Sequence, residues 1–164
     1  MSRTSRGFVP AWQMEGMILL AVVGVVLAIV IPAFVSFKAR GATQDALKRV
    51  TPVSEAVSGY FLRTGKMPED KAELGEAQLR AAQGGSIKAV KVVGGTIVVE
   101  LTGLGVNGKF LVLRPTVNLA KPTRPLRWVC QGTPVPSGWD LIGGDQIVDQ
   151  VEQEYLPQSC RSSG

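Results

Sequence analysis

The sequence predicts an α+β protein in which one long amino-terminal helix packs on an antiparallel four-stranded sheet. Three observations favour this fold class. An uncharged segment covers residues 16–37, an apolar stripe with helical spacing follows it, and paired β-branched runs occupy the middle of the chain. A helix and a meander of strands can each bury one apolar face against the other.

The uncharged segment is long enough to cross a membrane. Its 22 residues would form a helix of about 33 Å, against a hydrocarbon core of about 30 Å. Glu15 precedes the segment, and Gly24 and Pro32 lie inside it. The segment exceeds the roughly 7–15 apolar residues of a cleaved secretory signal, and two cations follow it. We therefore expect it to persist as a transmembrane stem.

The ends of this stem divide the chain into three parts. Residues 1–7 form a short basic segment that resembles a leader, residues 8–37 form the stem, and residues 38–164 form one modest head. Two arginines precede the stem and two cations follow it closely, so the positive-inside rule does not orient the chain.

The cysteines indicate which side of the membrane holds the head. Cys130 and Cys160 both lie in the head and are too far apart for a CxxC redox or zinc motif. Two unrelated buried thiols are one interpretation, but a structural disulfide is favoured, and it requires an oxidising compartment. The head is then outside the cytoplasm and ends in a disulfide-closed loop, which contributes about 3–4 kcal/mol in the chain-entropy model.

Beyond the stem, the helix is predicted to continue as an amphipathic half. An apolar stripe recurs there at spacings of three or four residues, and its members are Leu47, Val50, Ser54, Val57 and Phe61. We expect this stripe to pack on the sheet of the head. Gly65 and Pro68 should end the helix, and a short helical piece is expected within residues 71–82.

Four short runs predict the sheet. Residues 86–93 and 96–101 are β-branched runs joined by two glycines, which is a strong hairpin signal. A third strand is expected at residues 109–114, where Pro115 stops it, and a fourth at residues 126–130.

The remaining segment, residues 131–159, has little regular pattern, although a turn of helix is expected near residues 146–153. It contains no Lys or Arg, and its acidic residues are Asp140, Asp145, Asp149, Glu152 and Glu154. Residues 38–127, in contrast, hold 15 cations and 7 anions, a balance of +8. Complementary patches on identical neighbours would explain this asymmetry, and so would attraction of the basic part to DNA or anionic lipid.

The composition gives little support for catalysis. The chain has no histidine, which is the commonest general base and metal ligand, and it has neither a GxxxxGK[ST] nor a GxGxxG motif. The acidic residues of the last segment lack the spacing of an EF-hand. We expect no metal or cofactor, and a structural or binding protein rather than an enzyme.

Residues 15–34 resemble the amino-terminal helix of type IV pilins. The acid at Glu15, the glycine nine residues on at Gly24 and the proline eight further at Pro32 match the pattern of that family. Three other segments resemble the end of the long pilin helix and the two ends of the disulfide loop: residues 60–68, 128–130 and 155–161. The last of these, YLPxSCR, points to major pilins of the type IVa kind.

This resemblance implies an inner-membrane subunit with a periplasmic head, which assembly machinery extracts and polymerises with identical copies into an extracellular pilus. Such fibres serve adhesion to a host surface, motility or DNA uptake. The resemblance also implies that a prepilin peptidase cleaves after Gly7 and that the new terminus, Phe8, is methylated. Glu15, Gly24 and Pro32 are implied in assembly, with the acid pairing with the terminal amine of a neighbour.

The acid lies three residues further along than the family pattern places it. That pattern makes the acid the fifth residue after cleavage, whereas Glu15 is the eighth residue counted from Phe8. If the acid sets the register, the first residue is Ala11, preceded by Pro10 instead of glycine. Either the junction has three extra residues, or the chain is processed unusually, or it is not processed.

Two other functions stay open. A minor pilin or a type II secretion pseudopilin would prime or push without forming the long fibre. A membrane-anchored DNA receptor for uptake is the second alternative, because a basic run lies beside an aromatic residue. The run comprises Lys109, Arg114, Lys121, Arg124 and Arg127, with Trp128 nearby. Spaced cations of this kind are more often a solvated face.

Overall fold

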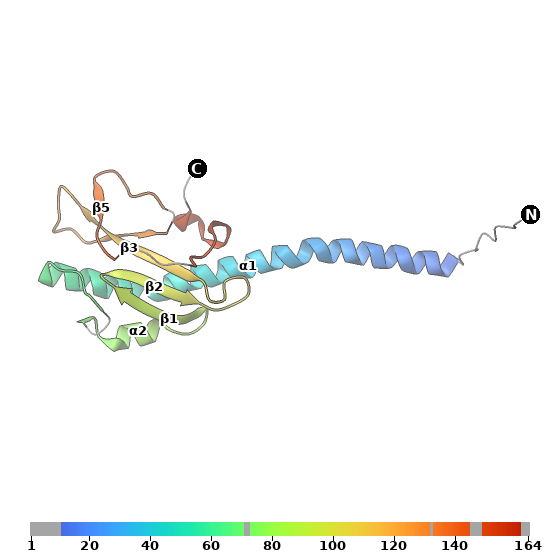
Figure 1. The fold of residues 1–164 in the computed structure, drawn as a ribbon, viewed down its shortest axis with the longest axis horizontal. Helices are drawn as coiled ribbons and strands as arrows, with labels where there is room; N and C mark the ends of the chain where they lie inside the picture. Colours follow the sequence, from blue (N-terminus) through green and yellow to red (C-terminus); the bar gives the residue numbers. More distant parts are fainter. Residues whose placement is uncertain (1–10, 71–72, 132, 145–148, 162–164) are drawn as a thin grey trace, which may run out of the picture. The chain divides into compact units, whose positions relative to one another are not determined.

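The computed structural model in Figure 1 describes residues 11–70, 73–131, 133–144 and 149–161. The chain forms two compact units, Met1–Val35 and Ser36–Gly164. Helix α1 (Ala11–Thr64) contributes its first part to the first unit and its remainder to the second. All strands belong to the second unit, which is the head.

Helix α1 confirms the predicted long helix. The helix is continuous across Pro32 and Pro52, although each proline lacks the N–H that would donate to the preceding turn. It ends, as expected, before Gly65, whose N–H donates to the Phe61 carbonyl at 2.8 Å. A glycine at this position satisfies one of the carbonyls that the last turn leaves without a partner.

The predicted sheet is confirmed as an antiparallel meander in the order β1-β2-β3-β4 (Figure 1). Its strands are β1 (Ile87–Val93), β2 (Thr96–Leu101), β3 (Phe110–Asn118) and β4 (Arg127–Cys130). Gly94 and Gly95 form the turn between β1 and β2 with φ of 53° and 82°. Two consecutive residues with positive φ are what a type I′ hairpin turn requires.

The prediction that Pro115 stops the third strand is wrong. β3 runs on to Asn118, and Pro115 pairs with Trp128 of β4. The N–H and C=O of one residue in an antiparallel strand point to the same side. The Pro115 carbonyl accepts a 3.0 Å bond from the N–H of Ile142, on the edge opposite β4. The missing N–H of the proline faces that edge too, so the ladder with β4 loses no bond.

The structure adds a fifth strand, β5 (Trp139–Leu141), which the sequence pattern does not indicate. It pairs with β3 along the same edge as β2, so β2 and β5 follow one another in one row. The chain then returns to the hairpin turn, where the Gly144 N–H donates to the Gly94 carbonyl at 3.2 Å. Only glycine fits at Gly143, because a Cβ there would lie 2.7 Å from Thr96 Oγ1.

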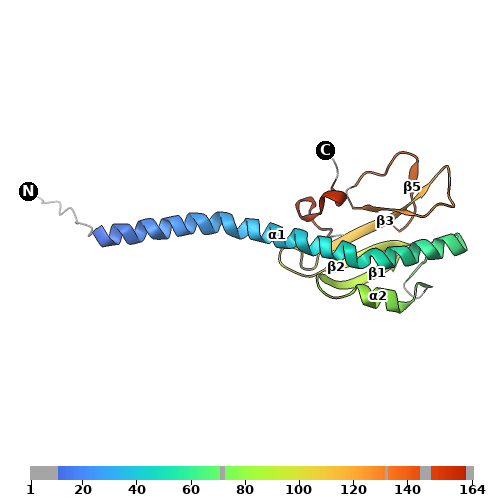
Figure 2. The same cartoon turned by 180° about the vertical axis from the view of Figure 1, so that it is seen from behind.

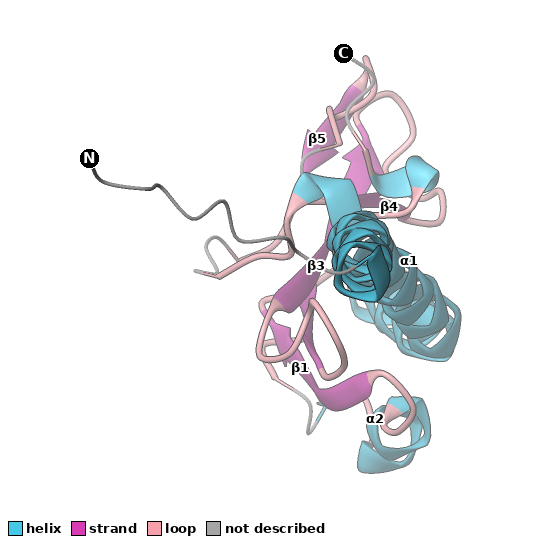
Figure 3. Ribbon diagram, turned by 90° about the vertical axis from the view of Figure 1, so that its right-hand side faces the viewer, coloured by secondary structure: helices cyan, strands magenta, loops and turns pink. Residues whose placement is uncertain are grey.

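The core of the head lies between the second half of α1 and one face of the sheet (Figures 2 and 3). Six helix residues at alternating spacings of four and three are at most 1% exposed: Ala39, Thr43, Ala46, Val50, Val53 and Val57. The buried face of the helix is therefore rotated relative to the predicted stripe, since only Val50 and Val57 of the stripe are fully buried. Leu47, Ser54 and Phe61 are half-buried at its border.

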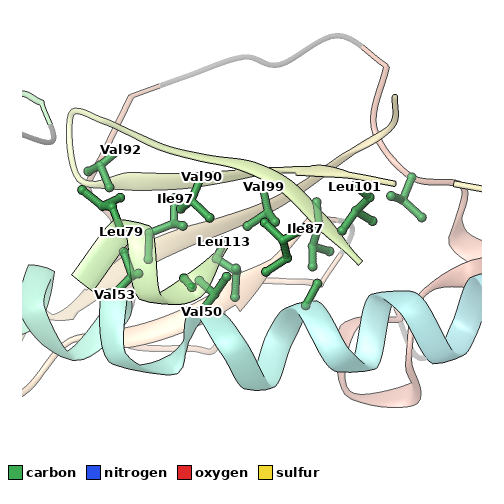
Figure 4. Packing of buried hydrophobic residues seen from close by; sticks show 14 of the residues in the cluster. Val50, Val53, Leu79, Ile87, Val90, Val92, Ile97, Val99, Leu101 and Leu113 are labelled. Atoms are coloured by element: carbon green, nitrogen blue, oxygen red, sulfur yellow. The ribbon is translucent and has the colours of Figure 1, made fainter. Parts of the chain in front are cut away.

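The helix meets the sheet through small and β-branched side chains. Figure 4 shows Val50 and Val53 of α1 facing side chains of the central strands, among them Ile97, Val99, Leu101 and Leu113. The first part of the buried stripe contains two alanines, Ala39 and Ala46, and valines follow.

Shorter helices complete the head. Helix α2 (Glu76–Ala82) confirms the expected helical piece and lies beside β1 (Figure 2). Two 3₁₀ helices, η2 (Gln153–Tyr155) and η3 (Gln158–Cys160), follow β5. The turn of helix expected near residues 146–153 falls partly outside the described residues.

Candidate functional site

The first unit presents an extended apolar surface. Every side chain from residue 15 to residue 34 is exposed. Of the helices that the structure describes, α1 is the one long and apolar enough to cross a membrane. Exposed apolar surface of this extent marks contact with lipid or with other proteins.

The stem residues predicted to act in assembly lie on different faces of the helix. Gly24 follows Glu15 by nine residues, and Pro32 follows Gly24 by eight. Nine residues separate Glu15 and Gly24 by about 13.5 Å and two and a half turns, which places them on opposite faces. These residues can contribute only separate contacts. The predicted processing residues, Gly7 and Phe8, lie outside the described residues.

The predicted disulfide between Cys130 and Cys160 is confirmed. The two Cα atoms are 5.1 Å apart, an ordinary separation for a bridge. Cys130 is the last residue of β4, and Cys160 lies in η3 without exposed surface. The bridge therefore ties the end of the described chain to the sheet.

Gln131, which the sequence pattern does not single out, joins the loop to the sheet from inside. Its side-chain oxygen accepts the Val112 N–H at 2.9 Å, and its side-chain nitrogen donates to the Val151 carbonyl at 2.8 Å. Its own N–H donates to the Val112 carbonyl at 3.0 Å. Because Gln131 is only 6% exposed, these bonds are shielded from water. They replace the backbone hydrogen bonds that a further strand would make at this edge. Its position after Cys130 is the one sequence signal for this role.

The last described residues also attach to α1. The Thr43 hydroxyl donates to the Tyr155 carbonyl at 2.7 Å, and Arg40 Nε donates to the Glu154 carbonyl at 2.9 Å. Arg161 Nη2 donates to the same Glu154 carbonyl at 2.9 Å. The guanidinium groups of two arginines thus donate to one backbone carbonyl. The Arg40 bond joins the helix to the C-terminal segment across 114 residues of sequence.

The segment between the cysteines, residues 131–159, carries an exposed negative surface. We call this segment the acidic loop. Its described carboxylates are Asp140, Asp149, Glu152 and Glu154, all exposed, whereas Asp145 lies outside the described residues. None of these four forms an ion pair with a Lys or Arg that the structure describes. A hydrogen bond to Glu154, then burial and repulsion from Glu152, raise the pKa of Tyr155. This surface is available to a cationic partner.

The cations of the predicted DNA-binding run are not gathered into one patch. Lys109 precedes β3, whereas Lys121, Arg124 and Arg127 follow it. At about 3.3 Å per residue, β3 separates the two groups by about 30 Å. Arg114 lies between them and is half-buried. The three cations that follow β3 in the sequence are exposed.

Trp128 does not present a free ring for stacking on a base. Its indole N–H donates to the Ser58 hydroxyl of α1 at 3.3 Å, and the ring packs against the core as a half-buried side chain. Trp128 therefore fastens β4 to the helix.

In the segments that the structure describes, no group of three His, Cys, Asp or Glu side chains converges to hold a metal ion. The described carboxylates of the acidic loop are spread between residues 140 and 154 instead of converging on one point. This spacing suits contact with another macromolecule.

Comparisons with known proteins agree with this arrangement. The family model described as Pilin (bacterial filament) matches residues 39–161. The type IV major pilin protein PilE1 of Neisseria gonorrhoeae is 26% identical over 165 residues, which cover 99% of this chain and 98% of the relative. A fimbrial protein of Neisseria meningitidis serogroup B is 24% identical over 170 residues, covering 99% and 98%. The fimbrial protein EcpC of Eikenella corrodens is 28% identical over 157 residues, covering 91% and 88%.

Proposed function

The chain belongs to the pilin family of bacterial filament proteins, and on this basis we propose that it polymerises with identical copies into a type IV pilus. The observation that carries the proposal is the fully exposed apolar surface of residues 16–34. A helix that is apolar all round is stable only in lipid or against other such helices. The bilayer covers this surface before assembly, and the stems of neighbouring copies cover it in the fibre.

Before assembly, the stem spans the inner membrane and the head lies in the periplasm. The disulfide between Cys130 and Cys160 supports this side, because such bonds persist in oxidising compartments. Assembly machinery then extracts the subunit after a prepilin peptidase has removed the leader at Gly7. The fibre serves adhesion, motility or DNA uptake at the cell surface.

In the fibre, Glu15 pairs with the terminal amine of a neighbouring copy. A carboxylate among apolar stems is costly unless a cation meets it. Cleavage after Gly7 supplies that cation at Phe8. The three-residue offset is bridged by a non-helical segment, which Pro10 favours because it disfavours the helical conformation of the residue before it.

The test is mass spectrometry of surface filaments that have been sheared from cells. We expect this chain as the main component, beginning at a methylated Phe8. Glu15→Ala should leave the subunit in the membrane but absent from filaments. Glu55→Ala, which removes an exposed carboxylate from the head half of α1, should leave filament yield unchanged.

Each alternative has its own outcome in that experiment. A trace of this chain in filaments made of another subunit would indicate a minor pilin, and its absence from all filaments would indicate a pseudopilin. Abundant filaments from Glu15→Ala would overturn the role of that carboxylate, and an intact Met1 would overturn the cleavage. The DNA-receptor alternative is weaker, because β3 separates its cations and Trp128 packs on α1.

A further inference from the structure

Two groups of exposed charges lie at opposite ends of β3 in the head. Residues 119–127, which we call the basic loop, follow β3 and carry Lys121, Arg124 and Arg127. At the other end of the strand, the Phe110 N–H donates to the Asp149 carbonyl at 3.0 Å. The exposed carboxylates there, which we call the acidic end, are those of Asp149, Glu152 and Glu154. In Figure 1, the loop after β3 and the short red helices after β5 lie at opposite ends of the sheet.

The two groups are too far apart to meet within one copy. The nine residues of β3 span about 30 Å. The contacts with α1 agree, because Thr43 binds the Tyr155 carbonyl beside the acidic end, and Ser58 binds Trp128 beside the basic loop. The 15 residues of helix from Thr43 to Ser58 rise about 22 Å. A contact between the basic loop and the acidic end therefore needs two copies.

Neither group of charges is paired within its own head. None of the three cations and none of the three carboxylates forms an ion pair with a residue that the structure describes. Lys109, Arg40 and Arg161 lie near the acidic end and form no ion pair with it either. Arg40 and Arg161 donate instead to the backbone carbonyl of Glu154. Opposite charges on a partner would match both groups.

The basic loop is ordered before a partner binds. The Asn118 side-chain oxygen accepts the N–H groups of Ala120 and Lys121 at 3.0 and 2.9 Å. The Arg124 N–H donates to the Lys121 carbonyl at 3.1 Å, which forms a second turn. Leu126, which is 8% exposed, anchors the end of the loop in the core. A loop held in this way presents its cations at a small cost in conformational entropy.

We propose that the basic loop of one copy binds the acidic end of the next copy in the fibre. The inference rests on the polymerisation of the proposed function and names the head surfaces that meet. A second copy suits the basic loop better than DNA, because the chain itself carries as many unpaired carboxylates as the loop has cations. Leu119, which is 64% exposed, adds apolar surface to the contact.

A contact of this kind favours an open polymer. The two surfaces are unlike, so a pair of copies joined by them still has one basic loop and one acidic end free. Further copies can then add at both ends, whereas a contact between two identical surfaces would stop at a dimer. Each pair of charges is individually weak, but together they fix which surfaces meet and in what orientation.

The first test uses filaments that have been sheared from cells and treated with a carbodiimide. This reagent joins a lysine ammonium to a carboxylate in direct contact: an amide bond forms, and the carbodiimide takes up the lost water as a urea. Mass spectrometry should find Lys121 linked to a peptide that contains the acidic end. Such a link must join two copies, because β3 keeps the two groups about 30 Å apart within one copy. Monomeric subunit in detergent should give no such link.

Charge reversal gives a second readout. Lys121→Glu with Arg124→Glu places like charges at the contact and should reduce filament yield several-fold. Glu152→Lys with Glu154→Lys should do the same, and Asp149 is left unchanged because lysine disfavours its φ of 63°. A subunit with all four changes has opposite charges at the contact again, so it should recover most of the wild-type yield. Thermal unfolding in detergent checks that each head is folded.

The matched control is Lys48→Glu with Lys91→Glu, which reverses two exposed lysines outside the basic loop. Combined with the acidic-end changes, this pair should not restore filaments. Three outcomes would overturn the contact: wild-type filaments without the Lys121 cross-link, no recovery in the subunit with four changes, or equal recovery with the control pair. Each of these leaves polymerisation intact, whereas the absence of this chain from all filaments would refute the proposed function.

Discussion

Gln131 illustrates how one buried side chain can complete the edge of a sheet. Its amide pairs with both the Val112 N–H and the Val151 carbonyl, so two backbone groups from distant segments depend on it. A buried backbone group without a partner keeps its full desolvation cost. The acidic loop is therefore attached by a polar contact inside the head as well as by the disulfide.

Replacing this amide should destabilise the head. Gln131→Leu keeps the approximate volume but leaves the two backbone groups unpaired, which should lower the free energy of unfolding by about 2–3 kcal/mol. Urea unfolding of the full chain in detergent, followed by tryptophan fluorescence, measures this loss. Gln150→Leu changes an exposed glutamine of the same loop and should stay within about 0.5 kcal/mol of the wild type. Equal midpoints for the two variants would contradict the role of Gln131.

Asp45 should make a small part of the stability depend on pH. Burial works against ionisation of Asp45, but hydrogen bonds from Arg49 and from the Ser86 N–H hold its pKa below the ordinary value. A carboxyl whose pKa falls on folding stabilises the protein above its unfolded pKa, near 3.9, and this contribution disappears as pH falls through the folded value. The side chain is 39% exposed, so solvent limits the effect to about a few tenths of a kcal/mol.

Unfolding at pH 7 and at pH 3 measures this contribution. Asp45→Asn should be less stable than the wild type at pH 7 and should match it more closely at pH 3. Arg49→Gln removes the cationic partner and should give the same pattern. A difference between Asp45→Asn and wild type that is unchanged between the two pH values would exclude the carboxylate charge as its cause.

At the scale of elements, local sequence patterns predicted most of the head. The two β-branched runs and their glycine turn determine β1 and β2, because both the strand preference and the turn geometry are local properties. The predicted end of β3 at Pro115 was wrong, because the cost of the missing N–H depends on which edge of β3 pairs with β4. β5 has only three residues, and its pairing with β3 is set by contacts distant in sequence.

The face of α1 that is buried and the attachment of the loop were harder to predict. Hydropathy favours Leu47 and Phe61 over Ala39 and Ala46, yet the two alanines are fully buried and the two larger side chains are half-buried. The disulfide could be predicted because cysteine is rare and chemically specific. Gln131 could not, since a glutamine acquires its role only from the two backbone groups that folding brings beside it.

Removing the disulfide should loosen the last element of the head. Changing both Cys130 and Cys160 to Ser avoids a free thiol and should lower the free energy of unfolding by about 3–4 kcal/mol, because the bridge closes a loop of about thirty residues. Amide hydrogen exchange should rise most in residues 149–161, while β1 and β2 keep their protection. The amount of exported subunit should also fall. Unchanged exchange in those residues would show that hydrogen bonds alone hold the loop.

At the scale of the whole molecule, the head carries its charges unevenly. The acidic loop has no Lys or Arg, whereas residues 38–127 carry a balance of +8. Individual surface ion pairs contribute about 0–1 kcal/mol, but a fibre repeats each contact at every subunit. We therefore expect the acidic loop of one copy to face basic surface on the next.

Neutralising the loop should weaken fibres without unfolding the head. The triple change Asp140→Asn, Asp149→Asn and Glu152→Gln keeps the shapes of the side chains, and asparagine tolerates the positive φ of 63° at position 149. Electron microscopy should show shorter or fewer filaments, and their yield should respond less to added salt than that of the wild type. Glu55→Gln and Glu69→Gln, outside the loop, provide a control for lost negative charge. Wild-type yield and salt response in the triple variant would exclude the interface.

The attachment of the C-terminal segment to α1 determines how the head responds to force. Tension applied through the stem enters at the first residues of α1 in the head, where Arg40 and Thr43 bind the carbonyls of Glu154 and Tyr155. From there, the bond between Cys160 and Cys130 passes the tension covalently to β4. A pull on that part of α1 is therefore carried to the sheet by the C-terminal segment as well as by the packed core.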